Sequence, residues 1–210
     1  MAGRDGFSLV EMIVVSALFI LLGVGILIAL MGGQTSYLSM DAYVQAQEEA
    51  RRAFDFMTRE LRLAGWDTIP LPAAVEGTQL DFQVALGYNL AGCTPNAICW
   101  GAYDQSNVAH PGWFVRYLEA AGPTPNNPTQ LVRRLFDGGG AQQGPQQVLA
   151  NNVVAATTSF NWAPSPARTM TINLQIRVQH PLLPGGSMPM PVGGPLTSQI
   201  RLRNASPKAP

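Results

Sequence analysis

Residues 12–31 of the chain, MIVVSALFILLGVGILIALM, form an uninterrupted apolar run of 20 residues. The run contains no charged side chain, and Ser16 is its only residue with a hydroxyl or amide side chain. About 20 apolar residues in a helix span the hydrocarbon core of a bilayer, which is ~30 Å thick. The run therefore predicts a transmembrane helix.

Two other interpretations of this run compete with a transmembrane helix. A buried core helix is disfavoured because helices of soluble proteins rarely stay apolar on every face over such a length. A cleaved secretory signal has an apolar region of about 7–15 residues, followed by a small-residue cleavage site. The run here is longer, and the residues after it, GGQTSYLSMDAY, contain no clear site of that kind. A single-pass helix remains the favoured prediction.

Beyond the apolar run, residues 34–66 form an amphipathic segment. They contain nine charged residues, whereas residues 7–33 contain only Glu11. A set of mostly apolar side chains recurs every three or four residues, which is typical of one helix face. Its members are Met40, Tyr43, Gln47, Ala50, Phe54, Met57, Leu61 and Ala64. This face predicts a packing surface for a partner element.

The two segments together predict one long helix. Gly65 suits a helix C-cap and Pro70 prevents continuation, so the helix is expected over residues 7–64. At ~1.5 Å per residue it is roughly 85–90 Å long. Each interior glycine costs about 1 kcal/mol relative to alanine, so bending or local melting is expected at four positions. These are Gly23, Gly25, Gly32 and Gly33.

Composition excludes some classes of protein. The 210 residues suffice for one domain with a sizeable core. Only 12% of residues are charged and 47% are hydrophobic, which argues against disorder. The 13 basic and 13 acidic side chains give zero net charge. Binding to nucleic acid is therefore not indicated.

Residues 67–210 contain all 17 prolines, a composition that favours turns and strands. Residues 169–179 alternate apolar and polar side chains and predict a half-buried strand. Further strands are predicted at residues 79–85, 113–119, 130–136, 152–162 and 198–203. Residues 180–196 are rich in proline and glycine, which predicts a loop or mobile flap. A helix followed by antiparallel strands indicates the α+β class.

Residues 6–11, GFSLVE, stand directly before the apolar run. A glycine, a phenylalanine, a small hydroxyl residue, two aliphatic residues and a glutamate match the processing motif of type IV prepilins and type II secretion pseudopilins. The resemblance implies that a membrane-embedded prepilin peptidase removes residues 1–6 by cutting after Gly6 and then methylates the new amino terminus at Phe7. Glycine suits the cut because it has no side chain to hinder access.

Glu11 is the one charged residue among residues 7–33, and the resemblance implies a partner for it. A carboxylate in the membrane costs ~2.5–3.5 kcal/mol on insertion scales, so such groups are usually paired and functional. The N-terminus of the helix offsets part of this cost. In this family the partner is the positive amino terminus of a neighbouring subunit, so Phe7 and Glu11 would set the assembly register. The alternative is an interfacial glutamate that reaches towards water.

The resemblance extends to two further segments. Residues 45–66, QAQEEARRAFDFMTRELRLAGW, resemble the end of the long helix in PilW-type minor pilins, and residues 198–204, SQIRLRN, resemble their closing strand. Pseudopilin J of type II secretion is a close relative of this group. Between these ends the resemblance is loose. The membrane-helix proline of many major pilins is absent here, which argues against a major-pilin role.

The resemblance implies a pilin fold, in which the long helix packs on an antiparallel β-sheet. Residues 7–33 would be the membrane and assembly half of the helix, residues 34–66 the amphipathic half, and residues 67–210 a β-rich periplasmic domain. The protein would reside in the bacterial inner membrane and then enter an extracellular or periplasmic filament. Arg4 on the cytoplasmic side agrees weakly with the positive-inside rule. The implied partners are other major and minor pilins, prepilin peptidase, the inner-membrane assembly platform and membrane lipid.

Cys93 and Cys99 are the two cysteines of the chain. In an oxidising periplasm their short spacing favours a disulfide that closes a small loop. Metal binding is the alternative, but only His110 and His180 are available, and no set of cysteines and histidines has zinc spacing. A free thiol pair is the third interpretation.

No catalytic motif was found, so an enzyme is not expected and no cofactor is predicted. Arg133 with Arg134, and Arg201 with Arg203, are expected to lie on the solvated faces of strands rather than in anion sites. The tryptophans are expected in the core or at subunit contacts, and three aspartates, Asp81, Asp104 and Asp137, in turns or at strand ends. The favoured function is a minor pilin that primes assembly at the filament tip. A J-like pseudopilin is the alternative, and a membrane-anchored binding protein that never assembles is less favoured.

Overall fold

The structure is a computed structural model that describes residues 8–69, 77–163, 168–179, 187–190 and 194–202. Over these residues the chain forms one long helix, α1 (Leu9–Leu63), followed by 12 strands. The strands are β1 (Gln79–Phe82), β2 (Val84–Tyr88), β3 (Ile98–Tyr103), β4 (Ala109–Pro111), β5 (Phe114–Thr124), β6 (Asn127–Phe136), β7 (Gln142–Ala150), β8 (Ser159–Ala163), β9 (Thr169–Leu174), β10 (Ile176–Gln179), β11 (Ser187–Met190) and β12 (Leu196–Arg201). The predicted α+β class is confirmed.

The helix runs without a break through all four interior glycines, so the expected local melting is not seen. It ends at Leu63, one residue before the predicted end. Gly65 does not form a left-handed cap. Its N–H donates instead to the carbonyl of Gln83. A Cβ at Gly65 would come within 2.6 Å of the ring of Trp100, so this position needs glycine for space.

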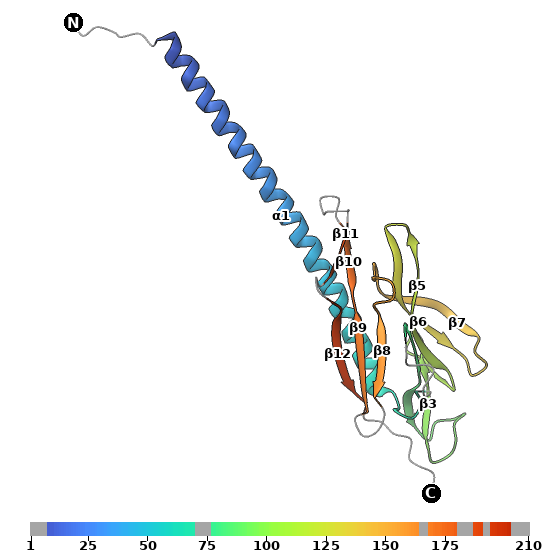
Figure 1. Cartoon of the computed structure of the whole chain (residues 1–210). Coiled ribbons are helices and arrows are strands. Elements are labelled where there is room, and N and C mark those ends of the chain that lie inside the picture. Colours follow the sequence, from blue (N-terminus) through green and yellow to red (C-terminus); the bar gives the residue numbers. More distant parts are fainter. Residues whose placement is uncertain (1–7, 70–76, 164–167, 180–186, 191–193, 203–210) are drawn as a thin grey trace. The chain divides into compact units, whose positions relative to one another are not determined.

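The chain divides into two compact units, Met1–Ala42 and Tyr43–Pro210. The described part of the first unit is helical from Leu9 onward. The second unit combines the end of α1 with the strands. In Figure 1 the strands β8, β9 and β12 lie alongside this end of the helix.

The buried face of α1 in the second unit follows a regular spacing of three or four residues. Its members are Ala46, Ala50, Ala53, Met57, Leu61 and Ala64. The prediction was right for Ala50, Met57, Leu61 and Ala64. Tyr43 is 41% exposed, so the prediction was wrong there, and Gln47 and Phe54 are only partly buried. Met40 belongs to the first unit. The buried face lies beside the predicted one, and four of its six members are alanines.

The described strands form four antiparallel sheets, with the orders β1-β5-β6-β7, β12-β9-β8, β2-β3-β4 and β10-β11. The largest buried side chains come from α1 and from strands of the first three sheets. They include Met57, Leu61, Phe82, Val84, Tyr117, Leu131, Phe160, Met170, Ile172 and Leu174. The core of the second unit therefore lies between the helix and the sheets.

Two of the strands predicted from sequence are each divided into two strands in the structure. The alternating run 169–179 breaks at Gln175, where β9 ends and β10 begins in another sheet. Likewise, Gln83 separates β1 from β2, which again belong to different sheets. In both places the alternation continues while the chain changes its hydrogen-bonding partner. Periodicity reports which side of a strand is buried, and it does not report the partner strand.

Other strands of the structure were not predicted from the sequence. β7 (Gln142–Ala150) was not predicted, because its glutamines, Gly144 and Pro145 resemble a loop. It is an edge strand, where proline is tolerated. β3 and β4 were also missed, and of residues 152–162 only Ser159 onward is a strand. The predicted loop 180–196 contains β11 and the first residue of β12, while residues 180–186 and 191–193 lie outside the described residues.

Candidate functional site

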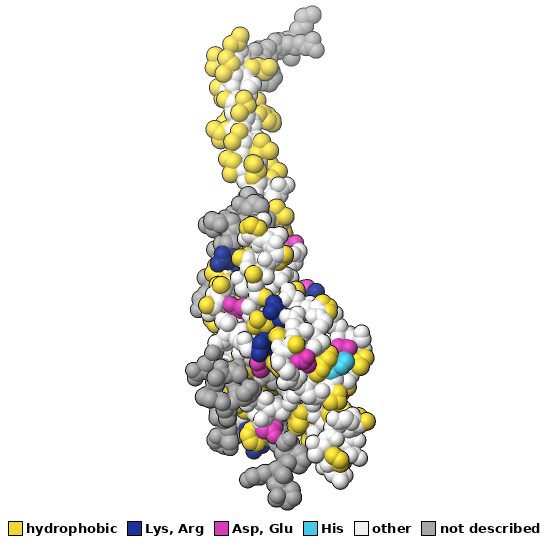
Figure 2. Space-filling view, turned by 90° about the vertical axis from the view of Figure 1, so that its right-hand side faces the viewer, with side chains coloured by type: hydrophobic (Ala, Val, Ile, Leu, Met, Phe, Trp, Pro, Cys, Tyr) yellow, Lys and Arg dark blue, Asp and Glu magenta, His cyan; other side chains and the backbone are white. Residues whose placement is uncertain are grey.

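The apolar part of α1 is exposed on all sides within its own unit. Large side chains from Leu9 to Met31 are between 43% and 75% exposed, and Figure 2 shows them covering the helix. It is the one helix of the described residues that is long and apolar enough to cross a membrane. Soluble monomers rarely expose a continuous apolar surface of this size. The helix is thus consistent with a single-pass membrane anchor.

Glu11 lies in the first turn of α1 and is exposed. Its neighbours Val10 and Met12 are also exposed, so the carboxylate stands within an apolar surface. The predicted cleavage and methylation residues, Gly6 and Phe7, lie outside the described residues. The structure thus places Glu11 at the start of the apolar helix and leaves its proposed pairing with an amino terminus as a prediction.

The second unit ties α1 to the sheets through a buried ion pair. Glu60 of the helix accepts hydrogen bonds from Nε of Arg133 at 3.0 Å and from its NH2 group at 2.6 Å. The hydroxyl of Tyr117 donates to the same carboxylate. Arg133 also donates to the carbonyl of Tyr103 at 2.7 Å. We call Glu60, Arg133 and Tyr117 the Glu60 cluster.

The Glu60 cluster is almost sealed from solvent. The side chains of Arg133 and Glu60 are 5% and 12% exposed, and Tyr117 is fully buried. Burial raises the pKa of the Tyr117 hydroxyl well above its usual value, and the negative charge of Glu60 adds to this shift. The hydroxyl therefore stays protonated and can donate to the carboxylate. Two donors on one buried carboxylate fix the helix against β5 and β6.

The expectation that Arg133 lies on a solvated face was wrong. Its neighbours at alternate positions, Leu131 and Leu135, are buried on the same side of β6. That two-residue period was the signal that could have placed Arg133 in the core. Arg134 points to the other side and donates to Gln146 at 2.8 Å. Arg201 is exposed as expected, and Arg203 lies outside the described residues.

A second carboxylate joins the helix to the sheets. Glu49 accepts hydrogen bonds from the backbone N–H and the side-chain amide of Asn151, at 2.7 and 2.8 Å. Glu49 and Glu60 are 11 residues apart, which is close to three helical turns, so both lie on one side of α1. The helix is therefore held at two levels by polar contacts, with the alanine-rich face packed beside them.

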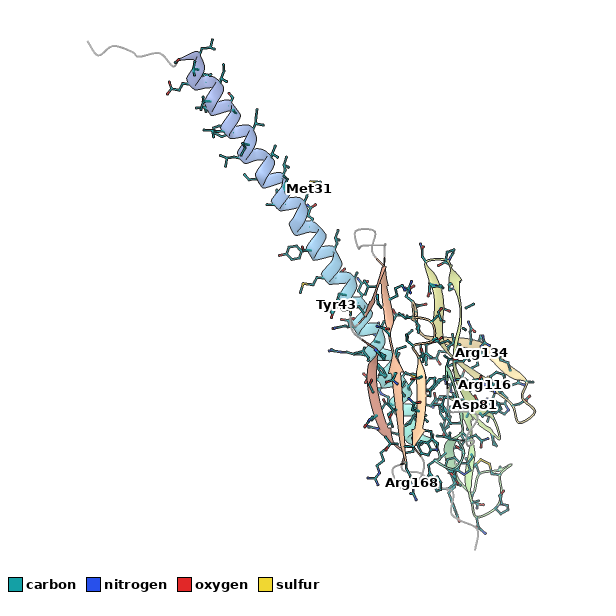
Figure 3. The ribbon with its side chains drawn as sticks, in the orientation of Figure 1. Met31, Tyr43, Asp81, Arg116, Arg134 and Arg168 are labelled. Atoms are coloured by element: carbon teal, nitrogen blue, oxygen red, sulfur yellow. A yellow bond between two sulfur atoms is a disulfide. The ribbon has the colours of Figure 1, made fainter. Side chains whose placement is uncertain are left out.

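On the opposite side of the large sheet, Arg116 of β5 lies beside Asp81 of the neighbouring strand β1 (Figure 3). Its guanidinium donates two hydrogen bonds of 2.7 Å to Asp81. The guanidinium carbon lies 4.4 Å from the ring centroid of Phe136 and 5.5 Å from that of Phe114. Asp81 is thus the third of the four residues of β1, whereas the sequence suggested a turn or a strand end. This group stabilises the sheet and offers no evident reactive centre.

The tryptophans were expected in the core or at subunit contacts. All four are partly buried, so they lie at the margin of the core. Trp66 carries Arg168 above its ring at 4.7 Å, and Trp113 stacks on His110. Among the described residues no group of three or more His, Cys, Asp or Glu side chains could hold a metal ion.

Cys93 and Cys99 form the predicted disulfide, which links a turn to β3. Cys99 is 1% exposed, so the bridge attaches the loop to the core. Metal binding and a free thiol pair, the two alternative interpretations, do not hold in this structure.

Removing this disulfide with Cys93→Ala and Cys99→Ala is expected to lower the free energy of unfolding by about 2 kcal/mol, because a bridge across so short a loop removes little chain entropy. Guanidinium titration of the full chain in detergent micelles, followed by tryptophan fluorescence, measures the change. A non-reducing peptide map is the control for the bridge itself. Alkylation of both cysteines in unreduced, denatured protein would contradict the disulfide.

Comparisons of the chain with protein-family models, with curated proteins and with solved structures each returned no match.

Proposed function

We propose that this protein is a minor pilin of a type IV pilus, a structural protein and not an enzyme, that assembles through its N-terminal helix. The observation that carries the proposal is the exposed apolar surface of α1, which begins at a single carboxylate, Glu11. A bilayer alone requires only the apolar surface. A carboxylate one turn inside it calls for a positive partner, and the GFSLVE motif supplies one after processing.

The proposed cycle has three steps. The chain is inserted in the bacterial inner membrane as a single-pass protein with its C-terminal unit in the periplasm. Prepilin peptidase removes residues 1–6 and methylates the amino group of Phe7. The apolar helix then moves, at the assembly platform, from lipid into a bundle formed with other pilins, and the pairing of Glu11 with a neighbour's amino terminus fixes the register. A tip position that primes assembly belongs to this proposal.

The pilin fold is also part of the proposal. It is supported by a long helix whose end packs against antiparallel sheets, and by the polar contacts of Glu49 and Glu60. Such contacts would let the second unit follow the helix as one body when the helix changes its surroundings from lipid to protein.

Processing provides the first test. Intact-mass measurement of the membrane-extracted protein is expected to give a chain that starts at Phe7 with one added methyl group. Retention of Met1, or a cut after residue 31, would exclude the proposal.

Assembly provides the second test. Glu11→Gln is expected to reduce the number of filaments, and the recovery of other minor pilins with this protein, by at least about tenfold. The substitution would leave the positive amino terminus of the neighbouring subunit unpaired in an apolar environment, which costs several kcal/mol. Asp55→Asn is the matched control, since it removes an exposed carboxylate from the same helix. Unchanged filaments in Glu11→Gln would favour a membrane-anchored protein that does not assemble. Loss of secretion with pili intact would favour a type II secretion pseudopilin.

A further inference from the structure

A small pocket of about 270 Å³ lies between the β3–β4 turn and the β6–β7 hairpin. One wall comes from the first turn and carries Gln105, Ser106 and His110. The other wall comes from the hairpin and includes Gln143 and Pro145. Trp113 and Leu135 also line the pocket. The pocket belongs entirely to the second unit and shares no residue with the apolar helix.

The two walls are built in the same way, each from one aspartate. Oδ1 of Asp104 accepts the backbone N–H groups of Ser106 and Val108, both at 2.8 Å. Its Oδ2 lies 3.1 Å from Nε2 of His110. The aspartate thus closes the turn with one oxygen and positions, with the other, the side chain six residues further along the chain.

Asp137 repeats this arrangement in the hairpin. Its Oδ1 accepts hydrogen bonds from the N–H groups of Gly139 and Ala141, both at 2.9 Å. Its Oδ2 accepts a hydrogen bond from Nε2 of Gln143 at 2.7 Å. Again the positioned side chain is six residues further on. Hydrogen bonds from the backbone and from these side chains lower the pKa of both aspartates. Two preformed turns therefore hold His110 and Gln143 at the same pocket, and such preorganisation favours ligand binding.

The pocket also has an aromatic surface. The ring of His110 stacks on the ring of Trp113, with centroids 3.9 Å apart and planes inclined by 11°. Trp113 is only partly buried, so part of its surface is open to solvent. Leu135, which is 6% exposed, also contributes apolar surface to the lining. Apolar ligand surface can thus pack beside an aromatic pair.

The charge of the lining restricts the chemistry of the ligand. Within the described lining residues there is no lysine or arginine to attract an anion. Asp104 is the one acidic residue there, and its oxygens already accept two N–H groups and contact His110. Gln105 and Gln143 each use one amide N–H within the protein, on the carbonyl of Pro145 and on Asp137. Their second amide N–H, their amide oxygens and the hydroxyl of Ser106 can donate to or accept from a ligand. Such a set suits a neutral ligand with several hydroxyl groups.

We propose that this pocket binds a single neutral sugar residue of a glycan. A sugar ring presents C–H groups on one face, which pack on an aromatic ring, and hydroxyl groups around its edge, which pair with amides and hydroxyls. The pocket volume lies just below the ~300–1,000 Å³ of sites for drug-sized ligands, so it fits one ring. The proposal is independent of the assembly function, since neither Glu11 nor the apolar helix takes part.

The test uses saturation-transfer NMR on the full chain in a zwitterionic detergent without a sugar headgroup. The probes are methyl glycosides of glucose, galactose, mannose and N-acetylglucosamine, with glucuronic acid as a charged comparison. At least one neutral glycoside is expected to bind, with a dissociation constant of about 0.1–10 mM, the weak range typical of so small a ligand. Absence of saturation transfer to every neutral glycoside overturns the proposal, and so does tighter binding of glucuronic acid.

Adjacent glutamines on β7 provide a matched pair of variants. Gln143→Ala is expected to weaken binding of the selected glycoside at least fivefold, whereas Gln142→Ala, whose side chain does not line the pocket, leaves binding unchanged. Trp113→Phe reduces the aromatic surface without emptying the site and is expected to weaken binding severalfold. Unfolding midpoints of all three variants show that each is folded. Equal binding by Gln142→Ala and Gln143→Ala overturns the proposal.

Discussion

Arg133→Ala is expected to lower the free energy of unfolding by about 3–5 kcal/mol, the usual cost of removing one partner of a buried ion pair. The substitution leaves the carboxylate of Glu60 almost sealed from solvent with Tyr117 as its remaining donor in the Glu60 cluster. It also removes the donor to the carbonyl of Tyr103. Denaturant titration of the full chain in micelles measures the change, because all four tryptophans lie in the second unit.

Arg134→Ala is the control for this prediction. It makes the same change of net charge on the next residue of β6, but Arg134 contacts Gln146 near solvent and is expected to contribute less than about 1 kcal/mol. The double variant Glu60→Leu, Arg133→Leu is expected to be less destabilised than Arg133→Ala, since it leaves no buried charge. Equal losses for Arg133→Ala and Arg134→Ala would show that the Glu60 cluster does not hold the helix to the sheet.

The second large effect is expected at the apolar contact of the same helix. Leu61→Ala should cost about 2–5 kcal/mol, because Leu61 is fully buried and its truncation removes apolar contacts and leaves a cavity. Leu63→Ala, two residues further along, removes the same atoms from a side chain that is 48% exposed. It should cost about 1 kcal/mol or less. The two variants are compared by the shift in unfolding midpoint under identical micelle conditions.

Equal destabilisation by the two leucine substitutions would contradict the placement of the buried face of α1. If Leu63→Ala alone lowered the free energy of unfolding, the helix would be rotated about its axis relative to this structure. Leu63 would then face the sheets and Leu61 would face solvent. The comparison therefore tests the alanine-rich packing face directly.

The helix could be predicted from sequence because its signals are local. Its length, its apolar run and its end within one residue follow from composition, glycine and proline. The buried face of α1 was predicted with the right period. Whether Phe54 or Ala53 belongs to that face depends on how the sheets pack against the helix, and a local sequence pattern does not contain this information. Ala53 is 1% exposed, while the larger ring of Phe54 is only partly buried.

The strands were harder because pairing is not local. The change of sheet at Gln175 leaves the alternation of side chains intact, and only the partner strands reveal it. β7 was missed because an edge strand facing solvent needs few apolar residues. The Glu60 cluster joins residues that are 73 positions apart, and the pocket joins two turns whose aspartates looked unrelated in the sequence.

The two polar ties of α1 have a mechanical consequence. A pull along the helix axis loads the contacts of Glu49 and Glu60 in parallel, because both lie on one side of the same rigid rod. Bonds loaded in parallel share the force and must fail together, whereas bonds loaded in series fail one at a time. Traction on the helix should therefore meet its resistance at these two levels.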